Sequence, residues 1–580
     1  MFAKYYQDEL AWLREMGAEL AEARPEMARF LGEPGADPDV ERMLEGFAFL
    51  TGRIREKLDD EFPELTHGFM DMFCPHYLRP VPSMAILQVS PKQNMNSGGK
   101  AVPRGTLIES TPVDGTRCRF RTVADITPAP VVLLDVNFQV GHPSTLSLRF
   151  GRRSGGLANL GEQPLRLHLT GDSQVSRSLY VALCHHVHAV RAEQTITQSA
   201  TDLSLLLNPK GLDHVRIVPG GLDESEAAID MPAGAFRGFR LLQEYFAFPE
   251  RFLFVDIYGL DNAGGDTLIF EFKDLPDNMP PVSASNVLLD CVPIVNLFDH
   301  DADPVRAQVG RTEYRIRPSG KDSSNYEVHS VKAVSGRVRG AVKQETYHPF
   351  FAFEARDRSS GRFFQVSRRD SLHVSGSDVY LRLGAEDPDK WSELDTISTD
   401  IVCTNRDLPT KLRPGDISTP TPETPGAFTY RSIGTPSAPI APPDGEEIHW
   451  RLLSHMTLNL RRLADRESMC TALSLYDFRA RTDRQARRRL DNLMTAISEV
   501  GVQRGTELLD GVPINGSEMR IAIDEEKAGG EGETFLLGTI LNEFVAQYVS
   551  LNSFSKLRIH CTTNNEVFSW PARVGRRITL

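Results

Sequence analysis

The first 75 residues carry hydrophobic side chains at helical spacing. Residues 2–20 place apolar side chains three or four positions apart, and residues 40–58 repeat the pattern. The second stretch has a clear start, because Asp37 can cap a helix and Pro38 suits a first helical turn. Two such helices can pack on each other or on a partner's helices, and the pattern leaves both open. We predict an N-terminal helical segment, residues 1–80, with these candidate partner-facing side chains: Phe2, Tyr6, Leu10, Leu13, Leu20, Phe47 and Ile54.

From about residue 80 the pattern changes to short apolar runs separated by Gly, Pro, Asn and Asp. Examples are SMAILQVSP, PVVLLDVNFQV, STLSLRF and PLRLHLTG, and the pattern returns in FLFVDIYGL and TLIFEFKDL. Such runs are typical of β-strands joined by turns. No regular alternation of strand and helix runs through the middle of the chain. The pattern therefore predicts an α+β fold with mainly antiparallel sheets rather than a doubly wound fold.

One segment, RLLQEYFAFPERFLFVDI at residues 240–257, combines both patterns. Its first half places apolar side chains on one face of a short helix, which Pro249 would end. Its second half is apolar on both faces, which is typical of a buried strand. Gln243 and Glu244 would lie toward the polar edge of the helix. A carboxylate beside Tyr245 could be a catalytic acid, but no partner base can be named, so we interpret the segment as a core element.

The remaining regions complete the expected organisation. Residues 415–446 are rich in Pro, Thr, Ser and Gly, which predicts a long irregular linker or an insertion. Beyond them, helices are expected near residues 450–463, 483–499 and 535–550, with strands at MRIAID and KLRIHC. We therefore expect an N-terminal helical segment (1–80), a first β-rich domain (81–234), a second β-rich domain (235–414), the linker (415–446) and a C-terminal α+β domain (447–580).

Composition and charge narrow the class of protein. The 580 residues are 40% hydrophobic and 25% charged, which is ordinary for a folded protein. This length predicts about three or four domains or subdomains. A formal net charge of −13 argues against nucleic acid as the main partner. No apolar run approaches the length of a membrane span, no secretory signal is recognisable, and seven scattered cysteines without a CxxC indicate a reducing compartment. We therefore expect a cytoplasmic protein without membrane insertion.

Two motifs suggest ligand binding, and each has a simpler structural interpretation. SGGKAV at residues 97–102 lacks the spacing of a phosphate-binding loop and is better explained as a turn before a strand. Cys184, His186 and His188 in LCHHVHAV would share one face of a strand, and zinc accepts such ligands. Three ligands on one strand are geometrically cramped, so we favour a helix end running into a strand.

Other candidate motifs also favour structural roles. Asp299, Asp301 and Asp303 in DHDADP resemble the start of a calcium loop without its later Gly and Glu. Cys74 and His76 fall in a proline-bounded turn that is unsuited to a nucleophile–base pair. We predict no catalytic residue, cofactor or metal. The arginines of RARTDRQARRRLDNL would largely face outward at helical spacing: Arg479, Arg481, Arg484, Arg487, Arg488 and Arg489.

Eight segments along the chain have a recognisable sequence and order. They are YYQDELAWLR, DPDVERMLEGFAFLTGRIREKLDDEFPEL, PHYLRPVPSM, PRGTLIES with CRFRT, LLQEYFAFPERFLFVDI, PIVNLFDHDADPV, HWRLLSHMTLNL and FLLGTILNEFVAQYVSLNSFSKL. Together they resemble the TssF family of type VI secretion system baseplate subunits, also called VasA or ImpG. The resemblance covers nearly the whole chain, while residues 415–446 match none of it.

The resemblance implies a structural protein that is similar to the wedge proteins of contractile phage baseplates. It implies assembly with TssG, TssE and TssK into wedges around a VgrG hub, with two TssF copies on one TssG. N-terminal helices would contribute to a bundle in the wedge. The baseplate would dock on the inner-membrane complex and nucleate the tube and sheath. Two alternatives are a wedge protein of a related contractile particle, such as a phage tail, and a secreted hydrolase effector, which would need a catalytic set that the motifs above do not supply.

Overall fold

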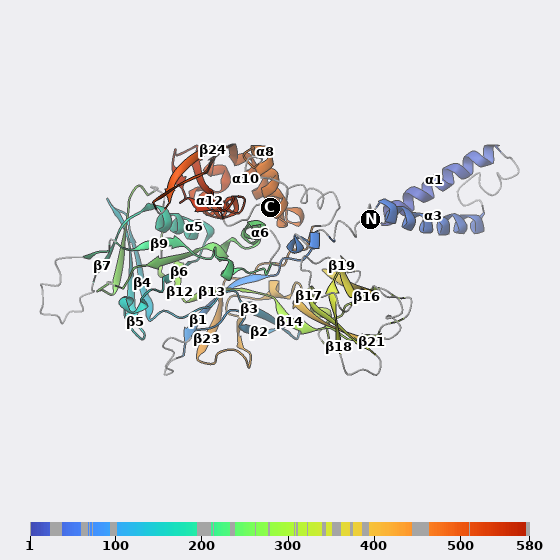
Figure 1. The fold of residues 1–580 in the computed structure, drawn as a ribbon, viewed down its shortest axis with the longest axis horizontal. Helices are drawn as coiled ribbons and strands as arrows, with labels where there is room; N and C mark the ends of the chain where they lie inside the picture. The colour runs from blue at the N-terminus through green and yellow to red at the C-terminus, as the bar shows by residue number, and fades with distance from the viewer. Residues whose placement is uncertain are drawn as a thin grey trace. The chain divides into compact units, whose positions relative to one another are not determined.

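The fold is taken from a computed structural model (Figure 1). The chain forms two compact units: residues 1–69 with 444–450, and residues 70–443 with 451–580. The structure describes residues 2–23, 37–59, 68, 70–71, 74–92, 101–193, 210–212, 214–231, 238–261, 263–275, 279–306, 308, 311, 313–321, 323–338, 344–350, 361–371, 375–385, 394–443, 463–509 and 511–575.

The first unit contains two helices that pack along each other, α1 (Phe2–Ala23) and α3 (Pro38–Asp59). Both helices were predicted from the spacing of apolar residues, and Pro38 begins the second one as expected. Asp37 caps α3, because its Oδ1 accepts the backbone N–H of Asp39 at 3.0 Å and its carbonyl accepts that of Glu41 at 3.0 Å.

The first sheet of the second unit has six antiparallel strands. Its strand order is β22–β2–β3–β13–β1–β23. The bounds are β1 (Met84–Pro91), β2 (Leu107–Val113), β3 (Thr116–Thr122), β13 (Cys291–Val295), β22 (Ile417–Pro420) and β23 (Phe428–Ile433). Side chains such as Leu87, Phe120 and Ile294 fill its core. This sheet therefore combines strands from three of the parts that were expected from the sequence, residues 81–234, 235–414 and 415–446.

The Pro-rich stretch 415–446 supplies the two edge strands of this sheet. β22 pairs with β2, and β23 pairs with β1. Ile417 and Phe428 are buried in the core. The expectation of an irregular connection is therefore wrong for residues 417–420 and 428–433, which form these two strands. Prolines fit here because an edge strand can lack a ladder N–H, and Pro420 is the last residue of β22.

Two smaller antiparallel sheets follow. The strand orders are β12–β6–β10–β9 and β4–β5–β11–β7–β8. Residues 254–257 of β10 are buried, as the two-faced apolar pattern predicted. The bounds are β6 (Leu165–Leu169), β9 (Arg216–Pro219), β10 (Phe254–Tyr258) and β12 (Val287–Leu289) for the first, and β4 (Val131–Gln139), β5 (Ser144–Arg152), β7 (Val187–Glu193), β8 (Lys210–Gly211) and β11 (Thr267–Phe272) for the second.

The largest sheet has eight strands. Its order is β14–β21–β17–β18–β19–β20–β16, and β15 pairs with β21. Among the described strands of this sheet, only β18 and β19 run parallel. The bounds are β14 (Phe298–Asp301), β15 (Val305–Arg306), β16 (Glu313–Arg315), β17 (Glu327–Val338), β18 (Gln344–Pro349), β19 (Arg362–Asp370), β20 (Ser377–Ala385) and β21 (Leu394–Thr404).

The C-terminal region combines a sheet with helices. A long hairpin, β24–β25, leads through helices to β26, which lies parallel to β25 and is contacted by α12. The bounds are α8 (Arg466–Tyr476), α9 (Arg479–Thr482), α10 (Arg484–Ala496), β24 (Ile497–Leu509), β25 (Val512–Ile523), α11 (Glu525–Ala528), α12 (Glu531–Ala546), β26 (Phe554–Cys561), β27 (Val567–Ser569) and β28 (Arg573–Val574). These elements confirm the expected helices near 483–499 and 535–550 and both expected strands, while residues 450–462 lie outside the described chain.

Two helices link the sheets to this region, α5 (Ser173–Val181) and α6 (Gly238–Ala247), and both pack on α12 (Figure 1). Short helical turns complete the chain: η2 (Pro75–Tyr77), η3 (Leu157–Leu160), η4 (Ala182–His186), η6 (Glu224–Glu226), η7 (Pro249–Phe252), η8 (Ala284–Asn286), η9 (Ser323–Asn325) and η12 (Leu408–Lys411). The predicted α+β class with mainly antiparallel sheets is confirmed. Among the described helices, none is both long and apolar enough to cross a membrane.

Candidate functional site

The candidate partner-facing residues of the N-terminal helices differ in exposure. Leu20 and Phe47 are exposed, Tyr6 and Leu13 are half-buried, Leu10 is buried, and the side chains of Phe2 and Ile54 lie outside the described part of the structure. A buried residue such as Leu10 stabilises the helix pair itself, so the exposed members are the ones available to a partner.

Small residues are buried in the two helices. Gly17 of α1 and Ala48 and Gly52 of α3 are all buried. Arg14 of α1 also pairs with Glu41 of α3, whose Oε1 lies 2.9 Å from Arg14 Nε. Because small side chains let two helix backbones approach closely, this packing does not need the larger apolar side chains.

The larger apolar side chains lie on exposed faces of the same helices. Trp12, Met16 and Leu20 recur every four residues in α1, and Met43, Phe47 and Leu50 recur at four and three in α3. These six side chains, here called the exposed helix faces, are between 37% and 65% exposed. Residues at such spacing share one side of a helix. Contiguous exposed apolar surface is typical of protein interaction sites.

Four members of the exposed helix faces were missed among the sequence candidates. Trp12, Met16 and Leu20 follow one another at a spacing of four residues, which is readable in the sequence. The candidates in this helix were instead taken mainly from the neighbouring series that contains Tyr6 and Leu10. Met43 and Leu50 belong to the stripe recognised in the second helix. Periodicity identified the stripes but could not tell which stripe faces the neighbouring helix.

Glu244 and Arg251 form a buried ion pair within the segment 240–257. Their side chains are 0% and 1% exposed. Glu244 Oε1 also accepts the backbone N–H groups of Ala228 and Ile229, each at 3.1 Å. Burial lowers the pKa of Arg251 to about 9, so its guanidinium remains charged at neutral pH.

This geometry answers whether Glu244 is a catalytic acid or a structural group. Both carboxylate oxygens are engaged, one by backbone amides and the other by Arg251. Arg251 also donates to the carbonyls of Gly221 at 3.2 Å and Glu226 at 2.7 Å. The pair therefore ties α6 to the chain at 221–229. The expectation that Glu244 and Gln243 lie at the polar edge of the helix is wrong, because both are buried; the turn at 249–252 returns the chain so that Arg251 meets Glu244.

A second buried carboxylate, Glu533 of α12, joins four helices. Its side chain is 3% exposed, and its Oε2 lies 2.6 Å from Arg177 Nη1 of α5. Its Oε1 accepts the hydroxyl of Tyr245 from α6 and pairs with Arg489 of α10. Burial and the nearby Glu533 charge raise the pKa of Tyr245. This arrangement, here called the Glu533 cluster, holds α5, α6 and α10 at the start of α12, where the helix dipole also favours a carboxylate.

Cys184, His186 and His188 do not share one face of a strand, which was the less favoured interpretation of this motif. Residues 182–186 form a π-helical turn that runs into β7, which confirms the favoured interpretation. His186 is buried, whereas His188 is exposed. Burial, followed by the charge of Asp256, raises the pKa of Cys184. His186 instead lies beside His185 and Glu566.

The pair Cys74 and His76 lies in the proline-bounded turn η2, as predicted. Burial raises the pKa of Cys74 to about 12 and lowers the pKa of His76 to about 3. At neutral pH the thiol is therefore protonated and the imidazole is neutral. This state does not suit a thiolate–imidazolium pair.

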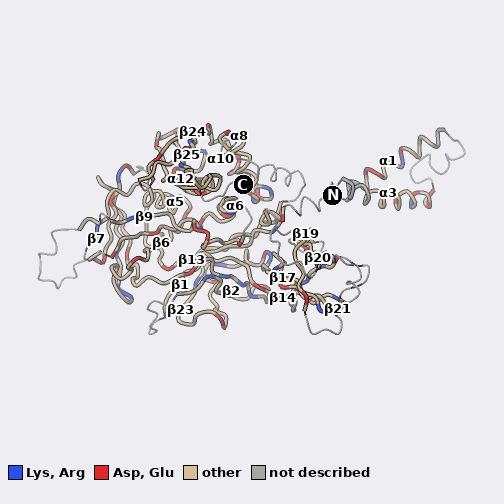
Figure 2. Tube along the Cα trace, viewed as in Figure 1, with Lys and Arg blue, Asp and Glu red and all other residues tan. Residues whose placement is uncertain are grey.

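The acidic and basic candidate motifs keep their structural interpretation. Within the described ranges, no group of potential metal ligands includes an aspartate of DHDADP, and Asp299 pairs with Lys332 at 2.6 Å. Residues 97–100 of SGGKAV lie outside the described chain. Figure 2 shows Lys and Arg interspersed with Asp and Glu along the chain. The arginine motif is exposed at Arg481, Arg484, Arg487, Arg488 and Arg489, as expected.

Comparisons with known proteins place these features in a wider context. The model of the family described as "Type VI secretion system, TssF" matches residues 1–577. A Pseudomonas aeruginosa PAO1 protein described as "Type VI secretion system component TssF1" is 30% identical over 626 residues, which cover 100% of this chain and 99% of that protein. The similarity therefore extends over essentially the whole length of both proteins.

Two solved structures are similar along nearly the full length. One chain comes from a cryo-electron microscopy structure of the type VI secretion system TssK–TssF–TssG baseplate subcomplex. It has 27% identity and a TM-score of 0.73, with 93% of this chain and 100% of that chain covered. A chain from the baseplate complex of a type VI secretion system has 26% identity and a TM-score of 0.66, with 100% of both chains covered.

Proposed function

Because the chain belongs to the TssF family of the type VI secretion system, we propose that it is a structural component of the baseplate wedge. The full-length family match is the observation that carries the proposal. The similarity to a chain of a TssK–TssF–TssG subcomplex supports it. The function is mechanical rather than catalytic: the protein provides shape and interfaces that hold the baseplate together until the sheath contracts.

The proposed partners follow from the family and from the solved assembly. We propose TssG and TssK as partners, because the similar chain belongs to a TssK–TssF–TssG subcomplex. TssE and a VgrG hub complete the wedge ring, with two copies of this chain on one TssG. The assembled baseplate lies in the cytoplasm, docks on the inner-membrane complex and nucleates the tube and sheath.

The exposed helix faces provide the contact with TssG in this proposal. Burying a large apolar side chain contributes roughly 1.5–3 kcal/mol, and about half of that remains available for side chains that are about half exposed. Two such side chains therefore contribute roughly 1.5–3 kcal/mol, or roughly 10- to 150-fold in affinity. Aspartate at the same positions adds the cost of burying a charge, so the loss should be larger.

The experiment is co-expression with the TssG-family protein of the same gene cluster, followed by capture on tagged TssG. We expect the wild-type chain to co-purify and Met43→Asp with Phe47→Asp to reduce the affinity at least about 10-fold. Arg42→Asp is the matched control, because Arg42 is exposed on the same helix outside the apolar series. Circular dichroism verifies that each variant keeps its helices.

The outcomes separate the function from the assigned face. Failure of the wild-type chain to bind TssG would contradict the proposed wedge role. Binding of the double variant at wild-type affinity would remove the exposed helix faces from the interface while leaving the wedge role intact. Substitution of Leu10 is a poorer probe, since this buried side chain supports the helix pair itself.

A further inference from the structure

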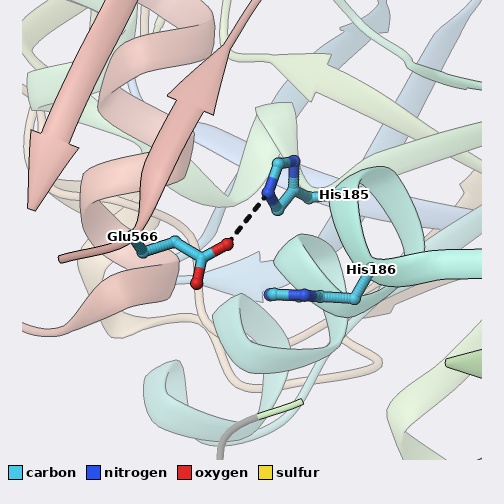
Figure 3. A group of neighbouring side chains, drawn as sticks. All are labelled: His185, His186 and Glu566. Atoms are coloured by element: carbon cyan, nitrogen blue, oxygen red, sulfur yellow. Dashed lines mark hydrogen bonds and ion pairs between the residues drawn. The ribbon is translucent and has the colours of Figure 1, made fainter. Parts of the chain in front are cut away.

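Two histidines and the carboxylate of Glu566 converge beside the π-helical turn η4, and a second carboxylate, Glu531, contacts one of the histidines. Figure 3 shows His185 and His186 directed toward Glu566 from the neighbouring C-terminal segment. His185 Nε2 lies 3.3 Å from Glu566 Oε1, and His186 Nε2 lies 3.1 Å from Glu531 Oε1. Ligand atoms of His185, His186 and Glu566 all lie within 4.8 Å of one another.

The turn that carries Glu566 is held rigidly between β26 and β27. The backbone N–H of Glu566 donates to Asn564 Oδ1 at 2.9 Å, and its carbonyl accepts the N–H of Cys561 at 2.9 Å. The carboxylate of Glu525 accepts the N–H groups of Thr563 at 3.2 Å and Asn564 at 2.8 Å. The position of Glu566 is therefore set by backbone contacts before any ligand binds.

Aromatic side chains pack against His185, and His186 is buried beside it. The ring of His185 lies 4.9 Å from that of Phe568 and 5.8 Å from that of Phe535, measured between centroids. The side chain of His186 is 3% exposed. An apolar shell of this kind limits the access of water to the ligand atoms.

The donor set fits zinc better than calcium or magnesium. Imidazole nitrogen and carboxylate oxygen are both zinc ligands, whereas calcium and magnesium prefer oxygen alone. In a tetrahedral zinc site the bond lengths place neighbouring ligand atoms about 3.3 Å apart. The separation of 3.3 Å between His185 Nε2 and Glu566 Oε1 is close to this spacing, and the ligand atoms of all three residues lie within 4.8 Å of one another. The carboxylate of Glu566 would also offset part of the charge of a divalent ion.

We propose that His185, His186 and Glu566 bind one Zn²⁺ ion, with Glu531 orienting the ring of His186 through its hydrogen bond. Three protein ligands leave one position of a tetrahedral ion for water. The ion joins the end of η4 to Glu566, which lies 381 positions after His185 in the chain. It thereby fastens the turn between β26 and β27 to the end of η4. This role is independent of which partner binds the exposed helix faces.

The test uses the full-length chain with any affinity tag removed, stripped with a chelator and dialysed against Zn²⁺. Elemental analysis should find one zinc per chain. His185→Ala with His186→Ala should abolish this binding. Glu566→Gln should weaken it at least about 10-fold, and is the milder probe because it keeps the side-chain shape. His188→Ala is the matched control, since this neighbouring histidine is exposed and outside the group.

Thermal unfolding with and without Zn²⁺ provides a second readout. We expect zinc to raise the unfolding midpoint of the wild-type chain and of His188→Ala, and to raise that of Glu566→Gln by a smaller amount. If the alanine variant does not fold, Glu566→Gln decides the matter, provided that its metal-free midpoint equals the wild-type value. Absence of stoichiometric zinc in the wild-type chain, or equal zinc affinity in Glu566→Gln, would overturn the proposal and leave two ordinary histidine–glutamate hydrogen bonds.

Discussion

Replacing Glu244 by Gln should weaken the contacts that hold residues 221–229 against α6. The substitution preserves shape and leaves an oxygen for the N–H groups of Ala228 and Ile229, but it leaves Arg251 without an opposing charge. Removing one partner of a buried ion pair costs about 3–5 kcal/mol. No reduction for solvent screening applies here, because the two side chains are 0% and 1% exposed. A loss of about 3 kcal/mol raises the population of the locally open state roughly 100-fold.

Hydrogen exchange read by mass spectrometry measures this opening directly. Peptides covering Ala228 and Ile229 should exchange at least about 100-fold faster in Glu244→Gln than in the wild-type chain. Glu250→Gln is the control, because this adjacent carboxylate is exposed. The double variant Glu244→Gln with Arg251→Met removes both charges and should recover much of the protection. An effect of Glu244→Gln no larger than that of the control, or additive effects in the double variant, would refute the buried pair.

Three further perturbations test other parts of the core. Glu533→Gln should lower the free energy of unfolding by about 3 kcal/mol, because Arg177 would lose its buried counter-charge; an unchanged denaturation midpoint would contradict this. Burial lowers the pKa of His168 to about 4, below the value of about 6.5 in the unfolded chain. Its contribution is therefore present above pH 6.5 and lost as the pH falls toward 4, so His168→Gln should flatten the acid side of the stability profile by up to about 3 kcal/mol in denaturant titrations. Gly538→Ala should destabilise the chain by about 1–3 kcal/mol in the same titrations, because the added Cβ would lie 2.2 Å from Trp570 Cη2; wild-type stability would show that the ring can move.

Local patterns were enough to predict the elements whose cause is local. The helix start at Asp37 follows from a capping residue and a proline in adjacent positions. The buried strand β10 follows from apolar residues on both of its faces. In each case the deciding residues lie within a few positions of one another. Composition failed in the Pro-rich stretch, because edge pairing with β1 and β2 depends on strands that lie far away in the sequence.

The contacts that define the candidate sites depend on chain segments brought together by folding. Tyr245 and Glu533 are 288 positions apart, and His185 and Glu566 are 381 apart, so no local spacing could pair them. The charge of Glu244 suggested a position at the polar edge of its helix, but this side chain is buried because Arg251 pairs with it. The exposed helix faces are an intermediate case. Their spacing was visible in the sequence, but small residues such as Ala48 decide which side of each helix turns inward.

The most direct test of the wedge role is the mass of the complex formed with TssG. The chain would be co-expressed with the TssG-family protein of its gene cluster and analysed by size-exclusion chromatography with light scattering. We predict a stable complex with two copies of this chain for each TssG. Separate elution of this chain and TssG, each at its own mass, would contradict its role as a baseplate wedge component.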